Sequence, residues 1–257
     1  MTNRIKPLLK ISLAVYALLL CAVWFFYPEF TACSKDSVWC SIAYWTTESA
    51  GKIGTLFIVT ITSTLYAISL PSIKEKVKIF LKTFLVLSIL LSAFAFLNEH
   101  LLKPAVKLAR PSHIFMIKQT HSRANLDSLY TLEEVKRKTF FQELLASDTL
   151  NFKSIDVRIL DHWVEEDGYS FPSGHSFNAF LLASILTFSI YQVEHKKIRL
   201  LCFLPLAWAF LVALSRVAVG AHSAMDVSVG AGVGLILSHA LLGVTATRDL
   251  IVPKKRI

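Results

Sequence analysis

Long apolar stretches separated by polar segments are the main pattern of this chain of 257 residues. A helix needs about 20 mostly apolar residues to cross a bilayer, because the hydrocarbon layer is about 30 Å thick. Six stretches meet this requirement, and they cover residues 9–27, 53–72, 79–98, 176–193, 199–215 and 224–245. The pattern therefore predicts an all-α integral membrane protein, a bundle of six transmembrane helices.

One polar segment, residues 100–175, is much longer than the others and separates the third and fourth predicted spans. Its Thr131-Leu132-Glu133-Glu134 sequence has the pattern of a capping box, which predicts an amphipathic helix reaching about Ser147. A second short helix is expected from Asp156 to Trp163. The segment is too short to predict an independent core. We expect one membrane domain over residues 1–257, with this segment as a small helical insert on the outer surface.

The composition and the distribution of charge support a membrane protein and set its orientation. Hydrophobic residues make up 54% of the chain and charged residues 18%, which is less charge than a soluble domain of this size usually carries. The net charge of +9 comes from clusters that six spans would place on one side of the membrane. These are Arg4, Lys6 and Lys10; Lys74, Lys76, Lys78 and Lys82; Lys196, Lys197 and Arg199; and Arg248, Lys254, Lys255 and Arg256. This side, with both termini, is predicted to be cytoplasmic, and membrane lipids rather than nucleic acid are the expected partners.

Cys33 and Cys40 lie in the predicted first outer loop. Disulfides persist in oxidising compartments, so a bond between them is compatible with an outward-facing loop. Their spacing alone does not decide whether the bond forms.

Three short polar clusters stand at the predicted outer ends of the spans. They are Lys103-x6-Arg110-Pro111, then Pro172-Ser173-Gly174-His175, and finally Ser215-Arg216-x5-His222-x3-Asp226. Polar residues scattered at random would be divided between the two sides of the membrane. Six spans place all three clusters on the same side, which predicts one shared site.

The first kind of chemistry in these clusters is anion binding. Lys103, Arg110 and Arg216 suit the charge of a phosphoryl group, because a guanidinium donates to two oxygens at once. Ser173 and Gly174 stand where a loop becomes a helix. Free amide groups at a helix start bind anions, and glycine permits their close approach. These five residues are the predicted phosphate-binding set.

The second kind of chemistry is covalent catalysis. His222 and Asp226 are four residues apart, so one helical turn can place them together. A carboxylate that binds one ring nitrogen leaves the other nitrogen free to attack phosphorus. His175 is then available to protonate the leaving oxygen and later to activate water.

Other residues give weaker indications. His113, His121 and His162 in the insert either contact substrate or have structural roles. Gly230 and Gly234 form a G-x-x-x-G pattern, which indicates close packing of the sixth span. No set of carboxylates resembles a divalent-metal cage, so metal-independent chemistry without a cofactor is expected.

The three clusters, in order and without substitution, resemble the motif set of the type 2 phosphatidic acid phosphatase superfamily. The resemblance implies a six-helix bundle with its site at the outer face. It implies that His222 forms a phosphohistidine, that Asp226 orients it, and that His175 is the general acid and then the base. The phosphate would be bound by Lys103, Arg110, Ser173, Gly174 and Arg216.

Further segments resemble bacterial lipid phosphatases of this superfamily: residues 44–48, 130–132 and 162–163. The resemblance implies a bacterial inner-membrane enzyme with a periplasmic site. Its substrates would be lipid phosphate monoesters or pyrophosphates, such as undecaprenyl pyrophosphate, phosphatidylglycerophosphate or phosphatidic acid.

Two other classes of function stay open at this point. A phosphotransferase would pass the phosphoryl group from a lipid pyrophosphate to another lipid, such as lipid A, instead of to water. A transporter or a lipid-binding scaffold would use the same cations without catalysis. The sequence decides neither the preferred lipid nor the oligomeric state.

Overall fold

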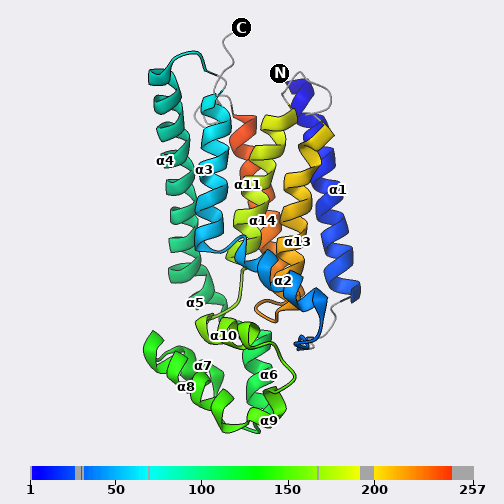
Figure 1. The fold of residues 1–257 in the computed structure, drawn as a ribbon, viewed down its shortest axis with the longest axis vertical. Helices are drawn as coiled ribbons and strands as arrows, with labels where there is room; N and C mark the ends of the chain where they lie inside the picture. Colours follow the sequence, from blue (N-terminus) through cyan, green and yellow to red (C-terminus); the bar gives the residue numbers. More distant parts are fainter. Residues whose placement is uncertain are drawn as a thin grey trace.

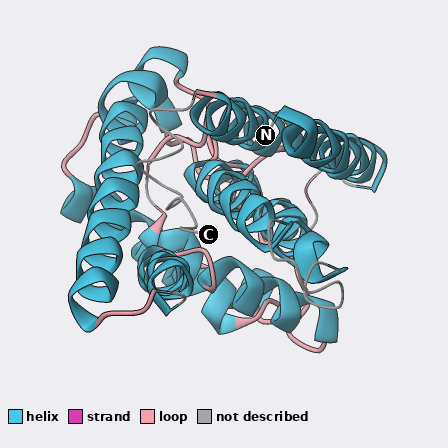
Figure 2. Ribbon diagram, turned by 90° about the horizontal axis from the view of Figure 1, so that it is seen from above, coloured by secondary structure: helices cyan, strands magenta, loops and turns pink. Residues whose placement is uncertain are grey.

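The computed structural model describes residues 2–26, 30, 32–68, 70–166, 168–191 and 200–244. Figure 2 shows only helices and loops in this part of the chain. A single antiparallel bridge between Ser34 and Ile155 is the one strand-like pairing among these residues. The prediction of an all-α fold is therefore confirmed.

Six long helices run side by side and coincide with the six predicted spans (Figure 1). They are α1 (Thr2–Phe26), α3 (Lys52–Ile68), α4 (Ile73–Leu97), α11 (Gly174–Tyr191), α13 (Leu204–Ala218) and α14 (Ala224–Gly243). A 3₁₀ turn, η2 (Leu200–Phe203), precedes α13.

Four helical segments in the described part are long and apolar enough to cross a membrane: Lys6–Phe26, Ile73–Val106, Leu200–Ala218 and Ala224–Gly243. A fifth is added if α2 (Val38–Glu48) and α3, which meet at 61°, are counted as one span. Helix α11 is not among them, so the number of six spans stays a prediction. Large apolar side chains on the outer helices are exposed, as a lipid-facing surface requires: Ile53 is 86% and Ile89 67% accessible.

Helix α11 is the centre of the bundle, since nearly all of its side chains from Ser176 to Phe188 are buried. It packs closely against α14 because α14 presents glycines to its backbone. A Cβ atom on Gly230 would lie 2.4 Å from the Ser173 carbonyl oxygen, and one on Gly234 2.5 Å from that of Phe177. The predicted close packing at this pair of glycines is confirmed.

The insert lies at one end of the bundle and consists of short helices (Figure 1). A π-helical turn, η1 (Asn98–Leu102), and α5 (Lys103–Val106) extend α4 toward it. It contains α6 (Pro111–Gln119), α7 (Leu126–Tyr130), α8 (Glu134–Ser147), α9 (Thr149–Phe152) and α10 (Val157–Glu165).

Both helices predicted for the insert are present, but the predicted capping box is wrong. Helix α8 begins at Glu134 after Glu133, and no side chain caps it. Thr131 instead ends the preceding helix, α7. The physical reason is that a short helix occupies residues 126–130. Thr131 is the C-cap of that helix, and its amide donates to carbonyls of the last turn. Asp156, in contrast, caps α10 by accepting from the Arg158 amide.

The insert has a core of its own, which the sequence did not predict. Trp163, Phe141 and Ile159 are fully buried in it. The core is shared with the bundle, because the Trp163 indole donates to the Val219 carbonyl at 2.6 Å. The loop between α1 and α2 also joins it.

The sequence left open whether Cys33, in that loop, and Cys40, in α2, are joined. Cys33 and Cys40 form a disulfide, with an S–S distance of 2.14 Å, and both belong to the core of the insert.

The two basic segments within the described residues lie at the same end of the bundle (Figure 1). The start of α1 and the connection between α3 and α4, with Lys74 and Lys76, lie at the end opposite the insert (Figure 1). The other two basic clusters, residues 196–199 and 248–256, lie outside the described residues.

A buried histidine connects the helices of the insert. His113 Nε2 donates to the Trp163 carbonyl at 3.0 Å, since a carbonyl only accepts. Its Nδ1 then accepts from the Tyr130 hydroxyl at 2.7 Å, and that hydroxyl accepts from the Arg110 amide at 3.2 Å. Burial lowers the pKa of His113 to about 3, so the ring stays neutral in the folded protein.

We expect Gly230→Ala to destabilise the bundle by about 1–3 kcal/mol, because the added methyl group overpacks the backbone contact between α14 and α11. Gly243→Ala is the matched control, since nothing lies within 4 Å of a Cβ atom there. The measurement is the thermal midpoint of each purified variant in detergent. Equal midpoints for the two variants would contradict the role of the glycine contact.

The neutral His113 makes stability depend on pH. The unfolded chain binds a proton below pH 6.5, whereas the folded one does not until about pH 3. His113 therefore leaves the free energy of unfolding unchanged above pH 6.5 and lowers it by about 2 kcal/mol between pH 6.5 and pH 5. The thermal midpoint should drop less between pH 7.5 and pH 5 in His113→Gln than in the wild type. The exposed His121, whose φ of 50° suits asparagine, supplies the control His121→Asn, which should drop like the wild type.

Candidate functional site

The three polar clusters meet at the end of the bundle that faces the insert. The Ser173 amide donates to the Asp226 carbonyl at 3.1 Å, which joins the second cluster to the third. Arg110 Nη1 donates to the Ala221 carbonyl at 2.9 Å, next to His222. The first and third clusters, which are more than one hundred residues apart in the sequence, are therefore in direct contact.

The third cluster pairs a histidine with a carboxylate. Asp226 lies in the first turn of α14 and forms a capping box with Ser223: the Ser223 amide donates to Asp226 Oδ2 at 2.8 Å. His222 Nδ1 is 3.5 Å from the same oxygen. This distance exceeds a good hydrogen bond, as is common for catalytic pairs without substrate. Both side chains are buried.

Burial, followed by the charge of Arg216, lowers the pKa of His222 to about 3, although Asp226 acts in the opposite direction. The imidazole is therefore neutral at physiological pH. A neutral ring has a free lone pair on the nitrogen that does not face Asp226, which is the state that a nucleophile requires.

His175 is the second residue of α11, and its ring lies close to the bend between α2 and α3. A Cβ atom on Gly51, at that bend, would lie 3.9 Å from His175 Nε2. Polar contacts connect this bend to α13: Thr47 Oγ1 is 2.7 Å from Ser215 Oγ, and Trp208 Nε1 donates to Ser49 Oγ at 2.9 Å. The sequence did not predict that α2 forms a wall of the site.

Ser173 and Gly174 stand at the start of α11, as predicted. Ser173 Oγ accepts from the Ser176 amide at 3.3 Å, which is the bond of an N-cap. The space where a Gly174 side chain would lie is bounded by Asn98 Nδ2 at 3.5 Å. Asn98 donates to the Pro172 carbonyl at 3.3 Å and so holds the loop before α11.

The two arginines converge on one carboxylate. Arg216 Nη2 donates to Glu166 Oε1 at 2.6 Å, and Arg110 Nη2 is 2.8 Å from Glu166 Oε2. Both guanidinium groups are buried. Lys103 differs from them: its ammonium group is buried but donates to Glu99, one turn earlier, at 2.5 Å.

The sequence did not predict Glu166 or Glu48 as site residues, and for His162 it left open a substrate contact or a structural role. His162 Nε2 accepts from Arg216 Nη1 at 2.9 Å, and its Nδ1 is 3.5 Å from Glu48. Burial by itself raises the pKa of Glu166, but the charges of Arg216 and Arg110 hold it well below its ordinary value. A glutamate shortly before the second cluster was the only available signal, and it is not distinctive in a polar loop.

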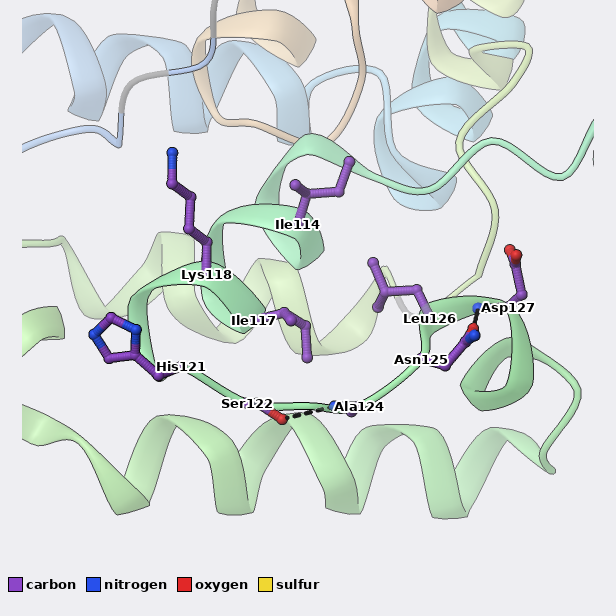
Figure 3. Close-up of a pocket in the computed structure, with 9 residues that line it drawn as sticks. All are labelled: Ile114, Ile117, Lys118, His121, Ser122, Ala124, Asn125, Leu126 and Asp127. Atoms are coloured by element: carbon purple, nitrogen blue, oxygen red, sulfur yellow. Dashed lines mark hydrogen bonds between the residues drawn. The ribbon is translucent and has the colours of Figure 1, made fainter.

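The remaining histidines of the insert lie elsewhere. His113 is buried in the network with Tyr130 described above. His121 lines a surface cavity of about 530 Å³ with Ile114, Lys118 and Asp127, and none of the residues that line it belongs to the three clusters (Figure 3).

The chain is similar in sequence to a known family and to several known proteins. Residues 81–249 match the PAP2 superfamily. Phosphatidylglycerophosphatase B of Escherichia coli strain K12 is 31% identical over 143 residues, 56% of this chain and 51% of that protein. The protein of the same name from Haemophilus influenzae is 24% identical over 147 residues, 56% of this chain and 58% of that protein. That from Bacillus subtilis is 30% identical over 102 residues, 34% of this chain and 49% of that protein.

This chain thus spans about half the length of the relatives it matches. The match to the family is broader and covers the whole stretch from Lys103 to Asp226 that carries the clusters. It also includes α11, α13 and α14, the helices that bring the clusters together. The family resemblance inferred from the motifs is confirmed, and the chain belongs to the PAP2 superfamily.

Proposed function

We propose that the protein is a membrane lipid phosphatase that forms a phosphohistidine on His222. The observation that supports this most is the placement of a neutral histidine and a carboxylate beside two buried arginines that already bind an anion. The names of the relatives, phosphatidylglycerophosphatase B, agree with this class of reaction.

In the first step His222 Nε2 attacks the phosphorus of the lipid phosphate. A P–N bond forms and the P–O bond to the lipid breaks. The Nδ1–H group of His222 donates a hydrogen bond to Asp226, which stabilises the imidazolium and stays ionised; this requires the 3.5 Å separation to shorten by a few tenths of an ångström. His175 gives a proton to the leaving oxygen.

In the second step His175 takes a proton from water, whose oxygen attacks the phosphohistidine. The P–N bond breaks, inorganic phosphate leaves, and His222 returns to its neutral form. Arg110 and Arg216 stabilise the phosphoryl oxygens throughout, and Ser173 and Gly174 line the start of α11 beside them. Lys103 exchanges its bond to Glu99 for a phosphate oxygen. No step needs a metal ion.

The substrates are lipid phosphate monoesters or pyrophosphates: phosphatidylglycerophosphate, undecaprenyl pyrophosphate and phosphatidic acid. A site at the end of an apolar bundle suits them, because the lipid tail stays in the bilayer while water reaches the phosphate from outside. We also propose six spans, a bacterial inner-membrane location and a periplasmic insert, with the basic end of the bundle in the cytoplasm.

We expect His222→Ala to lower phosphate release by at least about a thousandfold, because the nucleophile is lost, and Asp226→Asn to lower it by about as much. The assay uses purified protein in detergent with EDTA, and tests undecaprenyl pyrophosphate, phosphatidylglycerophosphate, phosphatidic acid and a soluble phosphate ester. His121→Asn, in the separate surface cavity, is the control and should keep full activity. Wild-type-like turnover in His222→Ala would overturn the mechanism, and activity that needs added magnesium would overturn the metal-free step.

The proposed orientation is tested by labelling single cysteines in intact cells. Ser147→Cys on the insert should react with a membrane-impermeant maleimide, whereas Lys74→Cys should react only after the membrane is permeabilised. Both positions are exposed, and the free Cys21 and Cys202 are first replaced by alanine. The opposite pattern of labelling would show that the insert faces the cytoplasm.

A further inference from the structure

The Glu166 carboxylate is positioned between Arg110 and Arg216 as a phosphoryl group would be. Each of its oxygens faces a different arginine: Oε2 is 2.8 Å from Arg110 Nη2, and Oε1 is 2.6 Å from Arg216 Nη2. Charge-assisted bonds of this length are strong in a buried setting. A planar anion with two oxygens thus satisfies the donors that a phosphoryl group would use.

The other nitrogens of these arginines already donate hydrogen bonds within the protein, with one exception. Arg110 Nε donates to the Gly168 carbonyl at 2.8 Å and Nη1 to that of Ala221 at 2.9 Å. Arg216 Nη1 donates to His162 Nε2 at 2.9 Å. Among the described residues, Arg216 Nε is a buried donor without a hydrogen-bond partner. A phosphate that uses the same Nη2 groups must therefore displace Glu166.

We propose that Glu166 is an internal anion that occupies the phosphate site in the substrate-free protein and leaves it when the phosphoryl group binds. This inference rests on the proposed function, because it takes Arg110 and Arg216 to be the phosphate-binding residues. Glu166 is thereby a residue that sets the affinity for phosphate, and it does not take part in bond making.

The surroundings of Glu166 allow this exchange. Glu166 is the last residue of the turn that ends α10, and 21% of its side chain is exposed, so it lies at the edge of the site. A Cβ atom on Gly168, two residues later, would have nothing within 4 Å, so the loop has open space.

The test is the affinity of the full chain in detergent for inorganic phosphate, measured by titration calorimetry. Glu166→Gln keeps the shape of the side chain but removes the competing charge. We expect it to bind phosphate about tenfold more tightly than the wild type. The KM for a lipid phosphate should fall with it, while kcat changes little.

Glu165→Gln is the matched control, because it removes the neighbouring carboxylate. Glu165 pairs with Lys138 at 2.8 Å, and Lys138 keeps a second partner in Glu134. This variant should bind phosphate like the wild type. Equal affinity in Glu166→Gln and the wild type, or weaker affinity in Glu166→Gln, would overturn the inference. Loss of folding in Glu166→Gln would also count against it, since it would make the carboxylate a structural partner of the arginines.

A double variant separates this inference from the proposed function. If the arginines bind phosphate, Glu166→Gln with Arg216→Ala should lose the tight binding that Glu166→Gln alone acquires. If the double variant keeps that tight binding, phosphate binds elsewhere and the assignment of Arg216 fails. If Arg216→Ala weakens phosphate binding but Glu166→Gln does not strengthen it, only the role of Glu166 fails.

Discussion

The close contact between α11 and α14 is the constraint on which the site depends. Two glycines of α14 let its backbone approach the carbonyl oxygens of Ser173 and Phe177. At that separation the Ser173 amide reaches the Asp226 carbonyl. The start of α11, which carries His175, and the turn that carries His222 are therefore held together by backbone contacts, which a side chain at either glycine of α14 would prevent.

Buried charge is the second constraint, and it explains why the insert belongs to the site. A buried guanidinium is costly unless its donors are satisfied. Arg110 meets this requirement with carbonyls from the loop after α10 and from Ala221. Its amide also donates to Tyr130, which connects it to His113 and Trp163 in the insert core. The same charges that suit phosphate thus hold the insert against the bundle.

The wall formed by α2 extends the site beyond the stretch that matches the family, residues 81–249. Thr47 contacts Ser215, and Glu48 lies 3.5 Å from His162, which in turn binds Arg216. The bend of 61° between α2 and α3 brings these residues over the end of the bundle instead of continuing a straight helix. The bend gives a physical reason for the resemblance in residues 44–48: these positions contact the site.

The sequence by itself determined the helical membrane class, the places of the long helices, and the three clusters. It could do so because hydrophobic length and residue spacing are local properties, as at His222 and Asp226, one helical turn apart. The local pattern gave a wrong prediction at Thr131, which ends α7 and does not cap α8. Only the tertiary structure decided that Cys33 and Cys40 are joined, that Lys103 turns to Glu99, and that Glu166 lies between Arg110 and Arg216. These contacts join residues from separate elements, and their energy depends on distance and burial in space, which no spacing along the chain encodes.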